Sequence, residues 1–483
     1  MRNVTRIVII GGGPGGYEAA LVAARLGAEV TVVDRDGLGG AAVLTDCVPS
    51  KTLIATAEVM TTFSNSYDEL GITVACKDDA SRVVGVDLGK VNRRVKRLAI
   101  AQSHDITQSV TRAGVTVVRG FGRLEGGQAL DGSRAVMVDV LDEGGQVAET
   151  RELRADVVLI STGNTPRELP EAKPDGERIL NWTQVYDLEE LPEELIVVGS
   201  GVTGAEFAGA YQALGSKVTL VSSRDKVLPG EDQDAATVLE DVFRRRGMNV
   251  MSRSRAESAT RVGDKVEVTL ADGRVITGSH VLMAVGSIPN TKGMGLEEAG
   301  VRLAESGHVK VDRVSRTTAP GVYAAGDCTG VFMLASVAAM QGRIAMYHAL
   351  GDAVAPLNLK TVASNVFTDP EIATVGYTEA DIEAGKMDAV AVKLPLRGNP
   401  RAKMQGIRDG FVKLFCRPGT GIVVGGVVVA PKASELIHPI ALAVDNNLTV
   451  EQIANTFTVY PSVSGSVAEA ARQLHVRKRE GAS

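Results

Sequence analysis

One segment of about thirty residues occurs twice in this chain, and both copies contain the same glycine pattern. Residues 7–36 read IVIIGGGPGGYEAALVAARLGAEVTVVDRD, and residues 195–224 read LIVVGSGVTGAEFAGAYQALGSKVTLVSSR. The copies align without a gap at an offset of 188 residues (199 − 11 = 188). In each copy a G-x-G-x-x-G sequence follows an apolar, β-branched run and precedes an alanine-rich run. This order predicts a strand, a tight turn, a helix and a second strand.

The glycines of this motif have separate physical tasks in a dinucleotide-binding turn. The first allows the tight turn, the second lets a diphosphate approach the backbone, and the third lets helix and strand pack closely. The diphosphate then lies at the positive N-terminus of the helix. One such motif is weak evidence, but two in the same context predict two nucleotide sites. The residues assigned to them are Gly11, Gly13, Pro14, Gly15, Gly16, Gly199, Gly201, Val202, Thr203 and Gly204.

The two copies differ at the end of their second strand. The first has Asp34 there, and a carboxylate at this position can accept a hydrogen bond from a ribose 2′-hydroxyl. The second has Ser222, Ser223 and Arg224, which favour a 2′-phosphate and hence NADPH, with NADH as the alternative. Arg224 as a solvated turn residue is the competing interpretation. Two dinucleotide sites in one chain suggest a redox relay between a bound flavin and an exchanging nicotinamide.

Composition excludes several classes of protein. Lysine and arginine number 52 and aspartate and glutamate 58, and this net charge of −6 argues against a nucleic-acid binder. No run approaches the roughly 18 apolar residues of a membrane helix, and the N-terminus lacks a signal-peptide pattern. The four cysteines form no CxxC and no zinc-like cluster, so we expect a cytoplasmic protein without a structural metal or membrane insertion.

Beyond the repeat, the chain resembles the flavoprotein disulfide reductases, a family that includes lipoamide dehydrogenase, glutathione reductase and mercuric reductase. The motifs that carry the resemblance are GGGPGG at 11–16, GGAAVLTDCVPSKTL from 39, STG at 161–163, GSGVTGAEF at 199–207, AVGSIPN at 284–290, YAAGD at 323–327, VFTDPEIATVG at 366–376 and ASELI at 433–437. The resemblance implies an α/β fold with two Rossmann-like dinucleotide-binding domains and a C-terminal α+β dimerisation domain. The implied bounds are 1–155 and 281–350 for FAD, 156–280 for NAD(P), and 351–483 for a homodimer interface.

The resemblance also implies the residues that bind FAD and NAD(P)H. Lys51 and Glu206 are expected to pair beside flavin N5, where an ammonium would stabilise negative charge on the ring; a surface ion pair is the alternative. Asp327 is expected to bind the ribityl chain. The cofactor-binding set outside the glycine turns is Asp34, Arg35, Gly40, Ala41, Ala42, Lys51, Gly122, Ser161, Thr162, Gly163, Ser222, Ser223, Arg224, Gly286, Gly326, Asp327 and Ala335.

Two departures from the family pattern affect the disulfide chemistry. The family has two redox cysteines with four residues between them; here Cys47 occupies the second position and Ala42 the first. Thiol–disulfide exchange needs both an attacking and a resolving thiol. The family's C-terminal His-Pro-x-x-x-Glu is replaced by a stretch with Tyr460 for the histidine and Gly465 for the glutamate. A phenol is a poor proton shuttle at neutral pH compared with an imidazole.

These departures favour an FAD-dependent NAD(P)H:quinone oxidoreductase, similar to the mycobacterial-type quinone reductases of this family. Electrons would pass from the flavin directly to a quinone, which Tyr460 would stack on or hydrogen-bond. Cys47 is either a thiol that contacts the flavin or a small buried hydrophobic residue. The alternatives are a nucleotide transhydrogenase, an atypical dihydrolipoyl dehydrogenase with a second thiol from Cys76 or Cys328, and a flavin-bearing binding protein without turnover.

Overall fold

The computed structural model describes residues 4–66 and 84–480, and the chain divides into two compact units. Each unit is assembled from segments that are distant in sequence. The first comprises Met1–Thr52, Asn92–Arg167 and Val285–Asn358, and the second comprises Leu53–Val91, Glu168–Ala284 and Leu359–Ser483. Cys76 lies outside the described residues.

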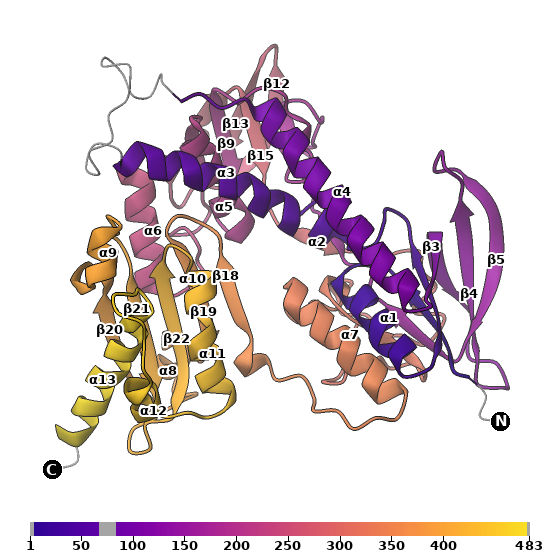
Figure 1. Ribbon diagram of the computed structural model, residues 1–483. Coiled ribbons are helices and arrows are strands. Elements are labelled where there is room, and N and C mark those ends of the chain that lie inside the picture. Colours follow the sequence, from indigo (N-terminus) through magenta and orange to yellow (C-terminus); the bar gives the residue numbers. More distant parts are fainter. Residues whose placement is uncertain (1–3, 67–83, 481–483) are drawn as a thin grey trace. The chain divides into compact units, whose positions relative to one another are not determined.

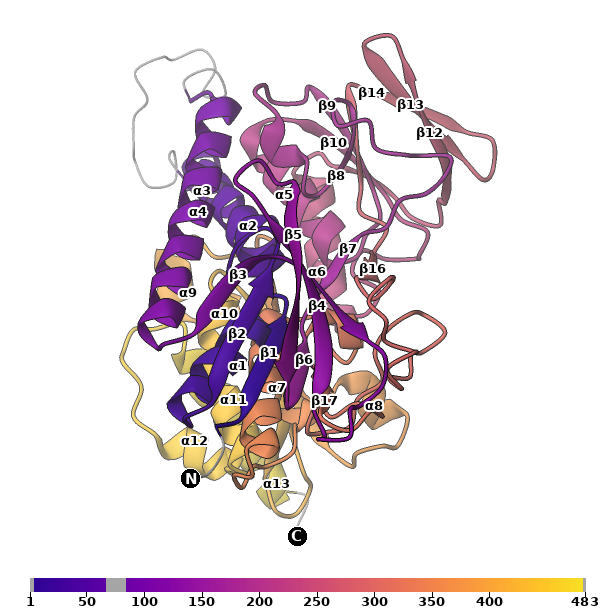
Figure 2. The ribbon, with the colours of Figure 1, turned by 90° about the vertical axis from the view of Figure 1, so that its right-hand side faces the viewer.

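A seven-stranded sheet forms the centre of the first unit (Figure 2). Its strands, in spatial order, are β17 (Val322–Ala324), β6 (Val157–Ile160), β1 (Arg6–Ile10), β2 (Glu29–Asp34), β3 (Thr116–Glu125), β4 (Arg134–Leu141) and β5 (Val147–Ala155). The strands from β17 to β3 pair in parallel, and β4 and β5 extend the sheet antiparallel. The parallel core strands are apolar and buried. One face packs against residues of the helices at 14–25 and 335–349, and the other packs against β4 and apolar residues between Met294 and Ala319.

Helices α1 (Pro14–Arg25) and α7 (Ala335–Ala349) lie side by side against this sheet (Figure 1). Their backbones approach closely, because a Cβ added at Gly342 would lie 2.0 Å from the carbonyl oxygen of Gly15. The first unit also contains α2 (Gly40–Leu44), a short ladder of β7 (Asn164–Pro166) with β16 (Ser287–Pro289), and the 3₁₀ turn η3 (Asp327–Thr329). Two helices cross the boundary between the units, namely α3 (Cys47–Ser66) and α4 (Leu88–Arg112).

The second unit contains a smaller parallel sheet that repeats the arrangement of β1, α1 and β2. Its strand order is β11 (Asn249–Met251), β10 (Lys217–Val221), β9 (Glu194–Val198), β15 (His280–Met283) and β8 (Ile179–Asn181). Helix α5 (Val202–Leu214) connects β9 to β10, and α6 (Gln233–Arg245) connects β10 to β11. An antiparallel sheet of β12 (Ala256–Val262), β13 (Lys265–Leu270) and β14 (Val275–Gly278) is inserted before β15.

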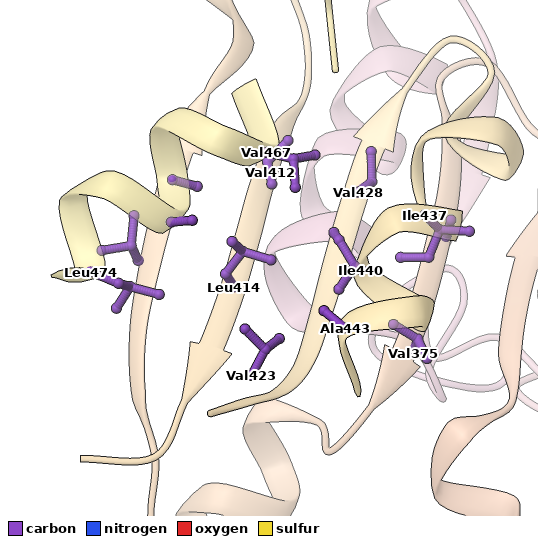
Figure 3. Packing of buried hydrophobic residues seen from close by; sticks show 14 of the residues in the cluster. Val375, Val412, Leu414, Val423, Val428, Ile437, Ile440, Ala443, Val467 and Leu474 are labelled. Atoms are coloured by element: carbon purple, nitrogen blue, oxygen red, sulfur yellow. The ribbon is translucent and has the colours of Figure 1, made fainter. Parts of the chain in front are cut away.

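The C-terminal part of the second unit is an antiparallel sheet with helices. The strand order is β18 (Ala363–Val366), β19 (Glu371–Gly376), β22 (Val423–Ala430), β21 (Phe411–Cys416) and β20 (Val390–Pro395). The helices are α8 (Glu379–Glu383), α9 (Pro400–Met404), α10 (Ala433–Leu436), α11 (His438–Asp445), α12 (Val450–Asn455) and α13 (Gly465–Glu480). Figure 3 shows the apolar core between this sheet and helices α11 and α13, in which Leu414, Val428, Ile440 and Leu474 are buried.

The predicted fold class is confirmed: two Rossmann-like βαβ units and an α+β part follow one another along the chain. One domain limit differs from the expectation, because β6 pairs with β1 and β17 in the first sheet although it begins just beyond residue 155. No helix within residues 4–66 and 84–480 is long and apolar enough to span a membrane.

Candidate functional site

The first glycine turn has the geometry that a bound diphosphate requires. Gly11 adopts a φ of +104°, and a Cβ there would lie 2.1 Å from the carbonyl oxygen of Ser161. At Gly16 a Cβ would lie 1.9 Å from the oxygen of Gly11, so this glycine lets α1 pack on the turn. At Gly13 a Cβ would meet no heavy atom within 4 Å. Gly13 is the N-cap of α1 and has no side chain to fill this space, so the backbone N–H groups there can bind a phosphate group.

The second turn reproduces this geometry residue by residue. Gly199 has a φ of +110°, with a Cβ position 2.2 Å from the oxygen of Ala284. The Cβ position of Gly204 lies 1.8 Å from the oxygen of Gly199, whereas that of Gly201 meets no heavy atom within 4 Å. Val202 and Thr203 begin α5, as Pro14 and Gly15 begin α1. The sequence repeat therefore folds into two glycine turns with the same backbone geometry, each with open space at the N-terminus of a helix. We call the turn at 11–16 the first cradle and the turn at 199–204 the second cradle.

The two cradles differ in the residues at the ends of β2 and β10 and in the hydrogen bonds that these residues form. Asp34 accepts hydrogen bonds from the backbone N–H of Gly12 (2.6 Å), Asp36 (2.9 Å) and Gly37 (2.7 Å). Burial raises the pKa of Asp34, and these three bonds oppose that shift. In the second copy Ser200 replaces Gly12 and Ser222 replaces Asp34, and their hydroxyls hydrogen-bond at 2.7 Å.

Several other predicted FAD-binding residues gather near the first cradle. Gly40 begins α2, the helix that also carries Ala41 and Ala42, and its Cβ position lies 2.8 Å from the Cα of Gly13. Arg35 pairs with Asp36 at 2.7 Å, and its guanidinium carbon lies 5.3 Å from the ring centroid of Phe121.

The loops after β6 and β16 are joined by hydrogen bonds. The Thr162 hydroxyl donates to the carbonyl of Asn290 (2.7 Å), whose side-chain amide donates to the carbonyl of Thr162 (2.9 Å). Gly163 and Gly286 both adopt positive φ values, and Ser161 donates its backbone N–H to Ile10. The remaining predicted positions in this unit are Gly122 in β3, Gly326 before η3 and Ala335 at the start of α7.

Asp327 is a buried carboxyl group next to this loop. Its burial, together with the nearby negative charge of Asp46, raises its pKa to about 6, although a hydrogen bond from Asn164 opposes the shift. The preceding Gly326 donates its N–H to Gln341 (2.8 Å) at a φ of +84°, which fixes the direction of the turn. A buried carboxylate of this kind suits a hydroxyl-rich ligand such as a ribityl chain, since hydroxyl donors would replace lost water.

We expect replacement of Asp327 by asparagine to stabilise the FAD-free protein at neutral pH. The pKa of Asp327 in the folded state lies above the ordinary aspartate value, so the folded protein holds this proton more tightly than the unfolded chain does. The stabilisation of the folded state by the neutral carboxyl is therefore complete below about pH 4 and is lost as the pH rises through 6. Asparagine carries no charge and avoids this loss, which amounts to about 2–3 kcal/mol. Urea unfolding of both proteins should show the variant gaining relative stability between pH 4.5 and 8. An equal difference at both pH values would contradict the assignment.

The predicted pair of Lys51 and Glu206 spans the two units, so the pairing remains a prediction. Lys51 lies in α3, and Glu206 lies in α5. Glu206 is only 3% exposed and accepts a hydrogen bond from the backbone N–H of Phe367 at 2.8 Å. A carboxylate buried to this degree is stable when it is hydrogen-bonded and paired with a cation.

No disulfide joins Cys47, Cys328 and Cys416 to one another in the described part of the chain. Cys47 is half-buried and is the first residue of α3. Cys328 is fully buried, its thiol donates to the carbonyl of Ala325 at 3.3 Å, and burial raises its pKa to about 11. Cys328 is therefore a poor source of the second reactive thiol that dihydrolipoyl chemistry would need.

Tyr460 lies in an exposed apolar segment between α12 and α13. Its side chain is 83% exposed, and the neighbouring Phe457 and Val459 are also exposed. Three large apolar side chains in one short segment are typical of a surface that another chain covers. Contact of Tyr460 with the partner subunit's flavin site remains a prediction.

The second unit holds a buried cation that sequence patterns did not indicate. The ammonium of Lys413 lies 2.7–2.8 Å from carboxylate oxygens of Asp232, Asp234 and Glu379. Burial alone would lower the pKa of Lys413, but the three carboxylates raise it above its ordinary value. These acids are the one group of three in the described part of the chain with metal-like spacing, and the ammonium occupies their centre.

Two residues next to the second glycine turn were not indicated by the sequence patterns. Ser200 could have been found, because the aligned repeat changes Gly12 to Ser200 in step with the change of Asp34 to Ser222. Arg253 has no motif around it and approaches Arg224 only because β10 and β11 pair.

Two family descriptions match this chain, one over its N-terminal residues and one over its C-terminal residues. Residues 5–342 match the pyridine nucleotide-disulphide oxidoreductase family, and residues 362–471 match the dimerisation domain of the same family.

Proteins similar to this chain are found by sequence and by structure. A protein named NAD(P)H dehydrogenase (quinone) from Mycobacterium tuberculosis strain H37Rv is 56% identical over 98% of this chain and 94% of its own length. A dihydrolipoyl dehydrogenase from Bacillus subtilis is 33% identical over 97% of this chain and 96% of its own. The crystal structure of LpdA from M. tuberculosis has a TM-score of 0.91 at 55% identity, covering 98% of this chain and all of that one.

Proposed function

Because the chain belongs to the pyridine nucleotide-disulphide oxidoreductase family, we propose that it is an FAD-dependent NAD(P)H:quinone oxidoreductase without a redox disulfide. The observation that carries the proposal is the contrast between two intact nucleotide cradles and an incomplete thiol pair. The cradles at Gly13 and Gly201 are open, whereas alanine stands at position 42, where the family has the partner of Cys47. The name of the M. tuberculosis relative supports the quinone as acceptor.

FAD, when bound, supplies two-electron chemistry between a nicotinamide and a quinone. In this account the backbone at Gly11, Gly13 and Gly16 holds its diphosphate, and Asp34 orients the turn and binds the ribose. The ammonium of Lys51 stabilises negative charge near the flavin ring. The second cradle holds NAD(P)H, and Ser223 and Arg224 favour NADPH over NADH.

We further propose that the protein acts as a cytoplasmic homodimer in which Tyr460 completes the acceptor site of the partner subunit. The dimerisation domain and the exposed segment around Phe457 support this arrangement. An aromatic ring next to the flavin would stack on a flat quinone. This role needs no proton shuttle and so is compatible with a phenol in place of the family's histidine.

The function is tested by comparing electron acceptors in steady state. The FAD-loaded protein is supplied with NADPH and with a menadione-type quinone, lipoamide or an oxidised nucleotide analogue. We expect turnover with the quinone to exceed that with the other two acceptors by at least an order of magnitude. Preferential reduction of the nucleotide analogue would indicate a transhydrogenase, and preferential reduction of lipoamide would indicate dihydrolipoyl chemistry.

Replacement of Cys47 by serine should leave quinone turnover within about threefold of wild type, because disulfide exchange needs a second thiol and alanine stands at position 42. Steady-state rates with NADPH and the quinone give the comparison. Serine is close in size to cysteine, so the packing at the start of α3 is retained. A loss of more than an order of magnitude would assign Cys47 a direct part in electron transfer.

A further inference from the structure

The position that usually contacts the ribose 2′-group is occupied by an inward-facing residue in the second cradle. Ser222 is fully buried, and its hydroxyl is shared between Ser200 (2.7 Å) and the backbone of Arg224 (3.1 Å). Its hydrogen-bonding capacity is therefore used within the protein. The 2′-group of the nucleotide's ribose must therefore be recognised by the exposed residues that follow β10 and by the residues next to them.

A second arginine is held next to this segment by backbone hydrogen bonds. Strands β10 and β11 pair in parallel up to Val221 and Met251, and the chains stay together beyond their ends. Arg253 donates its backbone N–H to the carbonyl of Arg224 at 2.9 Å, and Ser254 donates to the carbonyl of Ser222 at 2.7 Å. Two arginines thus follow the carboxyl ends of adjacent parallel strands, the edge where nucleotides bind in such sheets.

The backbone of Arg253 adopts an unusual conformation. Its φ is +52°, in the left-handed region that residues other than glycine rarely occupy. Non-glycine residues in this conformation concentrate at ligand-binding sites. The bond to Arg224 maintains the conformation, and the Arg253 side chain is 78% exposed.

Asp225 provides a competing anion for the Arg253 side chain. The Nε of Arg253 lies 2.5 Å from the carboxylate of Asp225, and both side chains are exposed. An ion pair in water contributes little, so a dianionic phosphate that can bind an arginine through two hydrogen bonds can displace the carboxylate. Asp225 itself repels a phosphate but can accept a hydrogen bond from a ribose hydroxyl.

We propose that Arg253 and Asp225 together determine the nucleotide preference: Arg253, next to Arg224, binds the 2′-phosphate of NADPH, and Asp225 opposes that binding and favours NADH. This inference rests on the proposed function only in requiring that NAD(P)H binds the second cradle; the electron acceptor does not enter it.

The test is nucleotide binding to FAD-loaded protein, measured by calorimetry as dissociation constants for NADP⁺ and NAD⁺. Arg253→Gln should weaken NADP⁺ binding about 10-fold and change NAD⁺ binding less than about twofold, as expected for loss of a charge-assisted hydrogen bond. Asp225→Asn should act in the opposite direction, with tighter NADP⁺ and weaker NAD⁺ binding. Arg255→Gln is the matched control, because it removes the same charge two residues away.

Equal effects of Arg253→Gln on both nucleotides, or an effect of Arg255→Gln on NADP⁺ as large as that of Arg253→Gln, would overturn the inference. Intact quinone turnover in such a result would leave the proposed function standing. Conversely, discrimination between the nucleotides by Arg253 in a protein that reduces no quinone would support the inference and refute the proposed function.

Discussion

Replacement of Gly204 by alanine is expected to slow reduction by NADPH strongly while leaving FAD content unchanged. The new Cβ would lie 1.8 Å from the carbonyl oxygen of Gly199, so α5 must shift away from the turn that we propose holds the diphosphate. A shift of this kind should lower kcat/KM for NADPH by roughly 100-fold or more, which corresponds to about 3 kcal/mol. FAD should remain bound because its cradle belongs to the separate sheet of β1 and β2.

Gly201→Ala provides the matched control for this prediction. Its Cβ meets no protein atom within 4 Å, and its φ is −71°, so the fold tolerates alanine. We expect the Gly201 variant to melt at the wild-type temperature and to lose nucleotide affinity, whereas the Gly204 variant should also melt lower. FAD absorbance and nucleotide titrations give the readouts. Wild-type kcat/KM in the Gly204 variant would show that α5 does not position the nucleotide.

Among the replacements described, Lys413→Met should lower the free energy of unfolding most. The change leaves Asp232, whose side chain is 3% exposed, without the cation of Lys413, and an uncompensated buried charge costs roughly 3–5 kcal/mol. Asp232 also caps α6 by accepting hydrogen bonds from Asp234 and Ala235 at 3.0 and 3.1 Å. The variant should therefore unfold at a clearly lower urea concentration than the wild type.

Lys393→Met is the control for Lys413→Met. Lys393 pairs with the same Asp234 at 2.7 Å, but its side chain is 43% exposed. Exposed ion pairs contribute about 0–1 kcal/mol, so this variant should unfold close to the wild-type midpoint. Similar losses in the two variants would show that burial of Lys413 has no special energetic importance.

The sequence repeat predicts the two nucleotide cradles because their geometry depends on glycine at fixed spacing. Gly11 and Gly199 need positive φ values, and Gly16 and Gly204 have no room for a Cβ, so the motif alone determines the local structure. The limit near residue 155 is less predictable. Strand β6 joins the first sheet through long-range pairing with β1, and no local pattern encodes that partner.

Interactions between distant side chains account for what sequence reasoning missed. Ser222 was predicted to contact the nucleotide, but its hydroxyl bonds Ser200, which a linear motif does not associate with it. The sequence around Lys413 is that of an ordinary strand. Only the fold brings Asp232 next to Lys413, because the two residues are 181 positions apart in the sequence. The chemistry of such pairs depends on topology, which short sequence patterns do not specify.

The most direct test of the account follows the flavin absorbance after sequential rapid mixing. FAD-loaded wild-type protein and the Cys47→Ser variant are each mixed anaerobically with one equivalent of NADPH, and then with menadione or oxidised lipoamide. The account predicts that menadione restores the absorbance at similar rates in both proteins and that lipoamide does not. Rapid restoration by lipoamide in the wild type, or loss of the menadione reaction in the serine variant, would contradict it.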